Sequence, residues 1–161
     1  MRYSLHRYRG EDPVMMITGH EPCGVVAELG MGSPSSLKVG DRVMCHHYAG
    51  CGICEICSMG YEQLCPSGHV TYGGGTGHGA NADYILVPSR TLVHLHDSLS
   101  FEEGAAFPVI YLTAYMMMFN LGNFRENETI LIHGAGGGVG TAAIQLAQTI
   151  MGGKIIGTAS K

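Results

Sequence analysis

Four cysteines lie close together in the sequence, with a spacing that would let their thiolates bind one metal ion. Cys51, Cys54, Cys57 and Cys65 are separated by two, two and seven residues. Thiolates are soft ligands, and four of them satisfy the tetrahedral coordination of zinc. The two-residue gaps let the first three sulfurs turn toward a common point, and Gly52 and Gly60 help the longer arm to return with the fourth. The spacing therefore predicts a four-cysteine zinc site.

Two other uses of clustered cysteines fit this pattern less well. Disulfides suit secreted domains, but residues 1–10 have no apolar core and cannot act as a signal peptide. An iron–sulfur cluster is the better rival, because ferredoxins also space cysteines by two residues and Cys65-Pro66 resembles their Cys-Pro ending. That pattern has three residues before its last cysteine, whereas this chain has seven. Zinc is therefore the preferred metal.

A second stretch has the pattern of a phosphate-binding loop. Residues 129–133 predict a short buried strand, residues 141–151 a helix and residues 154–158 a second strand. The residues between the first strand and the helix that would cradle a pyrophosphate are Gly134, Gly136, Gly137, Gly138, Val139 and Gly140. Glycines let a ligand approach the backbone, and a helix N-terminus offers unpaired N–H groups. A tight turn needs fewer glycines, so we interpret the stretch as the opening unit of a dinucleotide-binding sheet.

The residues after this loop bear on which nicotinamide cofactor would bind. In NAD-binding loops an acidic residue, about 20 residues further on, binds the ribose hydroxyls. No Asp or Glu occurs after Glu128, and the second predicted strand continues into Ala159, Ser160 and Lys161. A hydroxyl and an ammonium group favour a 2′-phosphate. The sequence therefore predicts NADP in preference to NAD, with Ser160 and Lys161 as cofactor contacts.

Composition limits the class of protein. A chain of 161 residues with 45% hydrophobic content can form one packed domain, or one domain and part of another. A formal net charge of −4 gives no basic footprint, so we expect no nucleic-acid partner. The longest apolar run, residues 105–119, is interrupted by Pro108 and Thr113 and falls short of the ~20 residues of a membrane helix. We expect a buried helix there, no membrane contact and a cytoplasmic location.

The elements that must position these residues change in character along the chain. Residues 18–96 predict short strands between glycine turns, for example at residues 24–30, 42–44 and 82–87, as in a small barrel or sandwich. Ser100 and Glu103 have the spacing of a capping box and predict the start of a helix. Pro108 is expected to break that helix, with a second helical run through Tyr111 to Leu121. The predicted fold class is mixed α/β.

Several motifs together resemble those of the zinc-containing medium-chain alcohol dehydrogenases. They are Gly19-His20-Glu21-Pro22 with Gly24, Val39-Gly40-Asp41-Arg42-Val43, the cysteine segment, and Leu112-Thr113-Ala114-Tyr115, in the order of that family. The resemblance implies a GroES-like β-barrel domain with a structural-zinc lobe at residues 1–104. It implies the first strand–helix–strand unit of a Rossmann domain at residues 105–161. The four cysteines would hold the structural zinc, and the glycine loop is closer to the quinone-reductase branch.

The resemblance also bears on a second, catalytic zinc. In that family this zinc polarises the substrate oxygen while hydride passes to or from the nicotinamide. His20 and Glu21 match two of its ligand positions, and a histidine hydrogen-bonded within a turn is the alternative interpretation of His20. Met1 and Val109 occupy the other two positions, and neither can replace an anionic ligand. We therefore expect an incomplete catalytic zinc site.

Two further residues match functional positions of the family. His6 matches a histidine that relays protons from the alcohol to solvent. Tyr3 replaces the Ser or Thr in the middle of that relay, so we favour a plain surface histidine over the relay role for His6. Thr113 matches a residue that contacts the nicotinamide.

The sequence favours one hypothesis and leaves three alternatives. The favoured one is an NADP-preferring oxidoreductase of the alcohol dehydrogenase type, acting on an alcohol and its aldehyde or ketone. The alternatives are a zinc-independent quinone or enone reductase, a non-catalytic zinc or iron–sulfur module, and a relative without activity. Members of the family are longer than this chain, so we expect a fragment, and we expect its full-length form to be a homo-oligomer.

Overall fold

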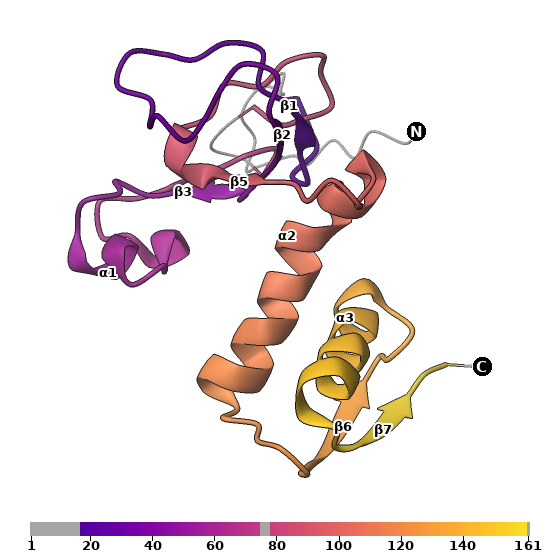
Figure 1. The fold of residues 1–161 in the computed structure, drawn as a ribbon. Helices are drawn as coiled ribbons and strands as arrows, with labels where there is room; N and C mark the ends of the chain where they lie inside the picture. Colours follow the sequence, from indigo (N-terminus) through magenta and orange to yellow (C-terminus); the bar gives the residue numbers. More distant parts are fainter. Residues whose placement is uncertain (1–16, 75–77, 161) are drawn as a thin grey trace, which may run out of the picture. The chain divides into compact units, whose positions relative to one another are not determined.

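The computed structural model describes residues 17–74 and 78–160 (Figure 1). His6 and Lys161, together with Met1 and Tyr3, lie outside the described residues. The chain forms two compact units, one from Met1–His20 and Tyr48–Val87, the other from Glu21–His47 and Pro88–Lys161. Each unit therefore combines segments that are distant in the sequence.

The first unit carries the cysteine segment between two short strands. β3 (Tyr48–Ala49) pairs antiparallel with β4 (Val70–Thr71). The helix α1 (Glu55–Ser58) and the 3₁₀ turn η1 (Glu62–Leu64) lie between these strands in the sequence. Because β3 and β4 pair, the residues between them form a closed lobe, which we call the cysteine lobe (residues 50–69; Figure 1).

The predicted strand at residues 82–87, also in the first unit, is wrong. These residues have no regular secondary structure, and no described strand pairs with them. The side chains of Tyr84 and Leu86 are 80% and 94% exposed. Alternating apolar residues form a strand only where a partner supplies hydrogen bonds and a surface to cover.

The second unit begins with a three-stranded antiparallel sheet. Its strands are β1 (Cys23–Val25), β2 (Arg42–Cys45) and β5 (Leu92–His94), in the order β1-β2-β5. The predicted strand at residues 42–44 is thus confirmed. The one predicted at residues 24–30 is shorter than expected, because the chain turns after Val26 has bonded to Asp41 and Gly40.

Arg42, from the Val-Gly-Asp-Arg-Val motif, ties this sheet to the helix that follows. Its guanidinium donates to the carbonyl oxygens of Leu99 at 2.6 Å and Asp97 at 3.3 Å, and lies 4.6 Å from the ring centroid of Phe101. A planar fork that bonds two carbonyls and stacks on a ring is a geometry that arginine provides and lysine does not. The motif therefore has a structural role here.

The long helix α2 (Phe101–Tyr115) begins as predicted and continues where a break was expected. Ser100 and Glu103 form a reciprocal capping box, with Glu103 N donating to Ser100 Oγ and Ser100 N donating to Glu103 Oε2. The predicted break at Pro108 is wrong, since the helix runs through it and into a π-helical turn (Met116–Leu121). A proline inside a helix costs about 3 kcal/mol. Packing of α2 on α3, β1 and β2, with Pro108 itself buried, offsets that cost.

The expected burial of this helix is only partial. Among the described residues, Phe101–Leu121 is the one helical segment long and apolar enough to cross a membrane by length and composition, and core helices of soluble proteins meet the same criterion. Gly104, Pro108 and Ala114 of α2 are buried, whereas Leu112 and Tyr115 are 44% and 46% exposed. The helix thus presents one buried stripe within its unit.

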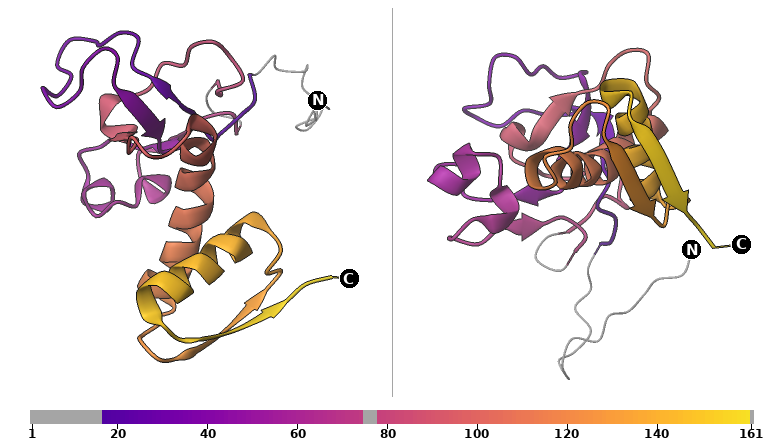
Figure 2. Two further views of the ribbon diagram at one scale, coloured as in Figure 1. Left: turned by 45° about the vertical axis from the view of Figure 1, so that its right-hand side comes forward. Right: turned by 90° about the horizontal axis from the view of Figure 1, so that it is seen from below.

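The predicted strand, loop, helix and strand are confirmed at the end of the second unit. β6 (Thr129–His133) and β7 (Lys154–Thr158) are parallel, and α3 (Gly138–Leu146) with a π-helical turn (Ala147–Met151) connects them (Figures 1 and 2). The buried core of this region is Ala114, Met118, Ile132, Ala142, Ala143 and Ala147. The small alanine side chains let α2 and α3 pack closely.

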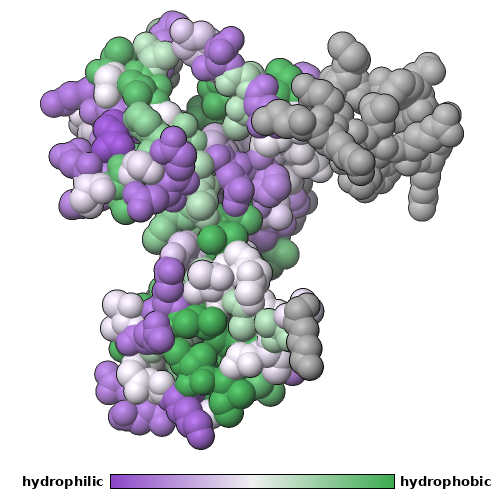
Figure 3. All heavy atoms as spheres, turned by 90° about the vertical axis from the view of Figure 1, so that its right-hand side faces the viewer, coloured by the Kyte–Doolittle hydropathy of each residue, from purple (hydrophilic) through white to green (hydrophobic). Residues whose placement is uncertain are grey.

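The opposite face of these two strands is open. Leu131 and Ile156 stand side by side in the register and are 54% and 44% exposed. Figure 3 shows apolar side chains gathered over the strand–helix–strand region. Parallel sheets are normally covered on both faces.

Candidate functional site

The four cysteine sulfurs meet at one point inside the cysteine lobe. All four Sγ atoms lie within 4.8 Å of one another, with 3.9 Å between Cys51 and Cys57 and 4.0 Å between Cys54 and Cys65. A tetrahedral zinc ion with bonds of about 2.3 Å places its sulfurs roughly 3.8 Å apart. The donor set and its spacing therefore fit one zinc ion, and leave little room for a cluster of several irons.

Local structure explains how the sulfurs are brought together. Cys54 caps α1, and its Sγ accepts a hydrogen bond from Cys57 N at 3.4 Å. Cys51 N donates to Cys65 Sγ, also at 3.4 Å. Gly52 and Gly60 have φ angles of +76° and +85°, so both glycines reverse the chain as the spacing predicted. All six cysteines of the chain are free thiols, which excludes the disulfide alternative here.

The sulfurs differ in how readily they ionise. Hydrogen bonds from the backbone N–H groups of Ile53 and Cys54 lower the pKa of Cys51 to about 6, whereas burial raises the pKa of Cys57 to about 12. Cys51 therefore ionises readily, while ionisation of Cys57 is opposed by burial and by the neighbouring cysteine side chains. A divalent cation would remove that opposition, because a coordinated thiol is deprotonated outright.

The residues predicted for a catalytic zinc are divided between the two compact units. Among the described residues, the four cysteines are the one group of three or more ligand side chains with closely spaced donor atoms. His20 belongs to the first unit, whereas Glu21, Val109 and Thr113 belong to the second. His20, Glu21 and Thr113 are exposed, and Val109 is half-buried on α2.

The backbone just before His20 is held tightly by residues that the sequence did not single out. Gly79 N, Ala80 N and Asn81 N donate to the carbonyls of Ile17, Gly19 and Thr18 at 2.8, 2.9 and 2.9 Å. Asn81 Nδ2 also donates to Thr18 Oγ1 at 2.8 Å. Gly19 has a φ of +97°, and a Cβ on Gly79 would lie 2.3 Å from its oxygen. The backbone immediately before His20 is therefore packed against Gly79, which lies sixty residues after Gly19 in the sequence.

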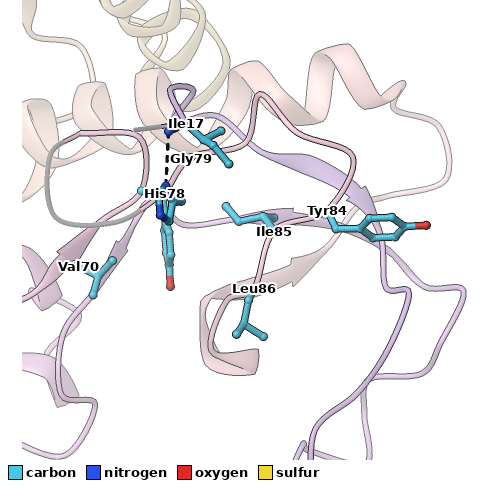
Figure 4. A pocket seen from close by; sticks show the side chains of 8 residues that line it. Ile17, Val70, His78, Gly79, Tyr84, Ile85 and Leu86 are labelled. Carbon is cyan, nitrogen blue, oxygen red and sulfur yellow. Dashed lines mark hydrogen bonds between the residues drawn. The ribbon is translucent and has the colours of Figure 1, made fainter. Parts of the chain in front are cut away.

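His78 and its neighbours border a cavity beside this turn. Ile17 N donates to His78 Nδ1 at 3.5 Å, and the cavity of about 450 Å³ is lined by apolar side chains that include Val70 and Ile85 (Figure 4). Residues 78–81, beside this cavity, are hydrogen-bonded to residues 17–19.

The glycine loop between β6 and α3 leaves open space where a ligand would approach. Gly134 has a φ of +69°, and Gly137 caps the N-terminus of α3. A Cβ added at Gly134 or Gly136 would meet no heavy atom within 4 Å. At Gly140 a Cβ would lie 2.5 Å from the Gly134 oxygen, so this glycine serves the packing of helix on strand. The loop thus has the open backbone and the helix N-terminus that a pyrophosphate needs.

The carboxyl ends of the two parallel strands meet beside this loop. His133 Nδ1 and Thr158 Oγ1 are 2.9 Å apart, and Ala135 N donates to the Thr158 carbonyl at 2.9 Å. Ser160 follows β7 and is exposed. The sequence indicated no role for His133 beyond its place at the end of a strand.

The chain resembles proteins of one family throughout its length. Residues 2–97 match the family described as alcohol dehydrogenase GroES-like domain. A zinc-type alcohol dehydrogenase-like protein, YphC of Escherichia coli K12, is 36% identical over 98% of this chain and 46% of its own length. The synaptic vesicle membrane protein VAT-1 homolog of Rattus norvegicus is 35% identical over 92% of this chain and 29% of its own.

Solved structures agree with these matches. The crystal structure of an NAD-dependent alcohol dehydrogenase superposes with a TM-score of 0.84 and 36% identity, covering 92% of this chain and 42% of that one. The chain therefore spans less than half the length of these relatives.

Proposed function

The chain belongs to the family of the alcohol dehydrogenase GroES-like domain, and from that membership we propose that it acts as a zinc-binding oxidoreductase. The proposed reaction is hydride transfer between NADP(H) and an alcohol or its aldehyde or ketone. We place the boundary between the GroES-like and Rossmann domains at residues 104 and 105. A cytoplasmic location and homo-oligomeric assembly of the full-length form complete the proposal.

The observation that carries this proposal is the open glycine loop at the N-terminus of α3. Space beside Gly134 and Gly136 lets a pyrophosphate approach the backbone, and the first N–H groups of α3 have no helical acceptor. The nicotinamide of such a cofactor supplies the hydride chemistry. This chain's residues supply the binding: the loop fixes the pyrophosphate, and Thr113 on α2 is the proposed contact for the nicotinamide.

We propose NADP as the preferred cofactor. Residues 129–161 contain no carboxylate that could bind the ribose hydroxyls or repel a 2′-phosphate. Ser160 follows the end of β7, and Lys161 comes next in the sequence. Hydrogen bonds to a charged group contribute about 1.5–3 kcal/mol each. We therefore expect NADPH to bind at least about tenfold more tightly than NADH.

The four cysteines are the proposed structural zinc site, and their role is to hold the cysteine lobe closed. A catalytic zinc would draw on His20 and Glu21, while Met1 and Val109 stand where anionic ligands would be needed. One zinc per chain is therefore the expected content. Val109, whose side chain offers no ligand atom, favours as second candidate a zinc-independent reductase of quinones or enones.

Two measurements on the purified protein test the proposal. Fluorescence titration with NADPH and NADH tests the cofactor site, and metal analysis counts the zinc. Reduction of aldehydes and ketones would favour the dehydrogenase, and reduction of quinones or enones alone would favour the second candidate. Failure to bind either nucleotide would overturn both and leave a metal-binding module without catalysis.

A further inference from the structure

A carboxylate outside the four-sulfur set joins the two ends of the cysteine lobe. Gly50, immediately before Cys51, donates its N–H to Glu62 Oε2 at 2.5 Å. Glu62 opens the 3₁₀ turn η1, and its carbonyl accepts from Cys65 N at 3.2 Å. Glu62 therefore bonds both to the residue that precedes Cys51 and to Cys65, the first and last cysteines of the set.

The contact is tight because Gly50 lies against the sulfurs themselves. A Cβ added at Gly50 would lie 2.7 Å from Cys57 Sγ and 3.0 Å from both Cys65 Cβ and the Glu62 carbonyl oxygen. The backbone at Gly50 thus contacts two of the four cysteines and precedes a third. A shift of Gly50 would change the spacing of the sulfurs directly.

We propose that Glu62 is a positioning residue for the zinc site: its bond to Gly50 N holds the four sulfurs at tetrahedral spacing before the metal binds. This inference rests on the proposed structural zinc and on nothing in the hydride chemistry. Outer groups that fix the ligands of a metal typically change its affinity 10- to 100-fold when they are removed.

A general electrostatic effect is the competing explanation, since any carboxylate near the site would attract a cation. The lobe contains a matched control for that effect. Glu55 lies in the first turn of α1, next to the ligand Cys54, and carries the same charge without taking part in the Gly50 contact. Glutamine at position 62 offers a second comparison, because its amide oxygen can still accept from Gly50 N.

The experiment measures zinc affinity by competition with a chromogenic chelator in four proteins: wild type, Glu62→Ala, Glu62→Gln and Glu55→Ala. We expect Glu62→Ala to lose about 10- to 100-fold in zinc affinity. Glu62→Gln should lose clearly less, since a neutral hydrogen bond keeps about half the strength of a charge-assisted one. Glu55→Ala should stay within about twofold of wild type, as expected of an exposed charge.

Cobalt substitution supplies a readout independent of affinity and activity. The visible bands of tetrahedral thiolate-bound Co²⁺ should be perturbed in Glu62→Ala and unchanged in Glu55→Ala. Equal zinc affinity in wild type and Glu62→Ala, or an equal loss in Glu55→Ala, would overturn the inference. If Glu62→Ala does not fold, Glu62→Gln provides the test. A zinc affinity of Glu62→Gln below that of Glu55→Ala supports the positioning role of Glu62, and a zinc affinity equal to that of wild type refutes it. A wild-type protein that binds neither metal would instead refute the structural zinc itself.

Discussion

Gly136 in the glycine loop and Gly140 in the first turn of α3 are predicted to respond oppositely to alanine. A Cβ at Gly140 would lie 2.5 Å from the Gly134 oxygen and 2.8 Å from Ala135 Cα, and these backbone atoms cannot rotate away. Overpacking of this kind costs up to about 3 kcal/mol. Alanine returns about 1 kcal/mol of helix propensity. We therefore expect Gly140→Ala to lose about 2 kcal/mol of unfolding free energy, a fall of roughly 4–8 °C in melting temperature.

Gly136→Ala should retain or slightly raise stability and weaken NADPH binding. No heavy atom lies within 4 Å of a Cβ at this position, and its φ is outside the left-handed region. Replacing glycine at an unstrained site stabilises a protein by about 0.4–1 kcal/mol through the unfolded state. The same methyl group would occupy space that the pyrophosphate needs, so we expect at least a tenfold loss of NADPH affinity, or about 1.4 kcal/mol.

Thermal denaturation and NADPH fluorescence titration of both variants provide the test. We expect Gly140→Ala to melt at a lower temperature than wild type, and Gly136→Ala to melt at or slightly above the wild-type temperature but to bind NADPH poorly. Unchanged NADPH affinity in Gly136→Ala would refute the assignment of this loop to the cofactor. Unchanged stability in Gly140→Ala would refute the packing argument and leave the binding argument standing.

Three further substitutions test how the site is supported. Arg42→Lys should lower the unfolding free energy in urea by about 1–3 kcal/mol, because an ammonium cannot bond two carbonyls and stack on a ring; an equal midpoint would contradict this. Ser100→Ala removes the cap of α2 and should cost about 1 kcal/mol, with Ser100→Asp as a control that keeps an acceptor. Gly79→Ala would place a Cβ 2.3 Å from the Gly19 oxygen and should cost about 1–3 kcal/mol and shift the NMR signals of the His20 imidazole. Unmoved His20 signals would show that this turn does not orient it.

The parts of the fold that sequence predicted well are those whose causes are local. The cysteines lie within one short segment, so two tight turns suffice to bring the sulfurs together, and they do meet. The capping box of Ser100 and Glu103 is a contact within one turn of helix, and it forms as predicted. The strand, loop and helix from Thr129 onward follow from a periodicity that their own residues carry.

The predictions that failed depend on contacts between distant segments. Pro108 does not break α2, because packing against α3 and two strands offsets the cost of a proline inside a helix. From the sequence alone, only that cost can be seen. Residues 82–87 alternate as a strand should, yet no described strand pairs with them.

The role of each glycine could not be predicted from the sequence, because a glycine required for packing and a glycine that faces open space are the same residue type. Gly79 and Gly140 are required because neighbouring carbonyl oxygens leave no room for a Cβ, whereas Gly136 faces open space. The first two therefore maintain the fold, and the third is free to serve a ligand. A run of glycines indicates that the backbone must be approached closely, but the structure is needed to say whether the approaching group is the protein's own carbonyl or a phosphate. At Gly136 no heavy atom of the described residues lies within 4 Å of an added Cβ, and this open space at a helix N-terminus is what the proposed cofactor site requires.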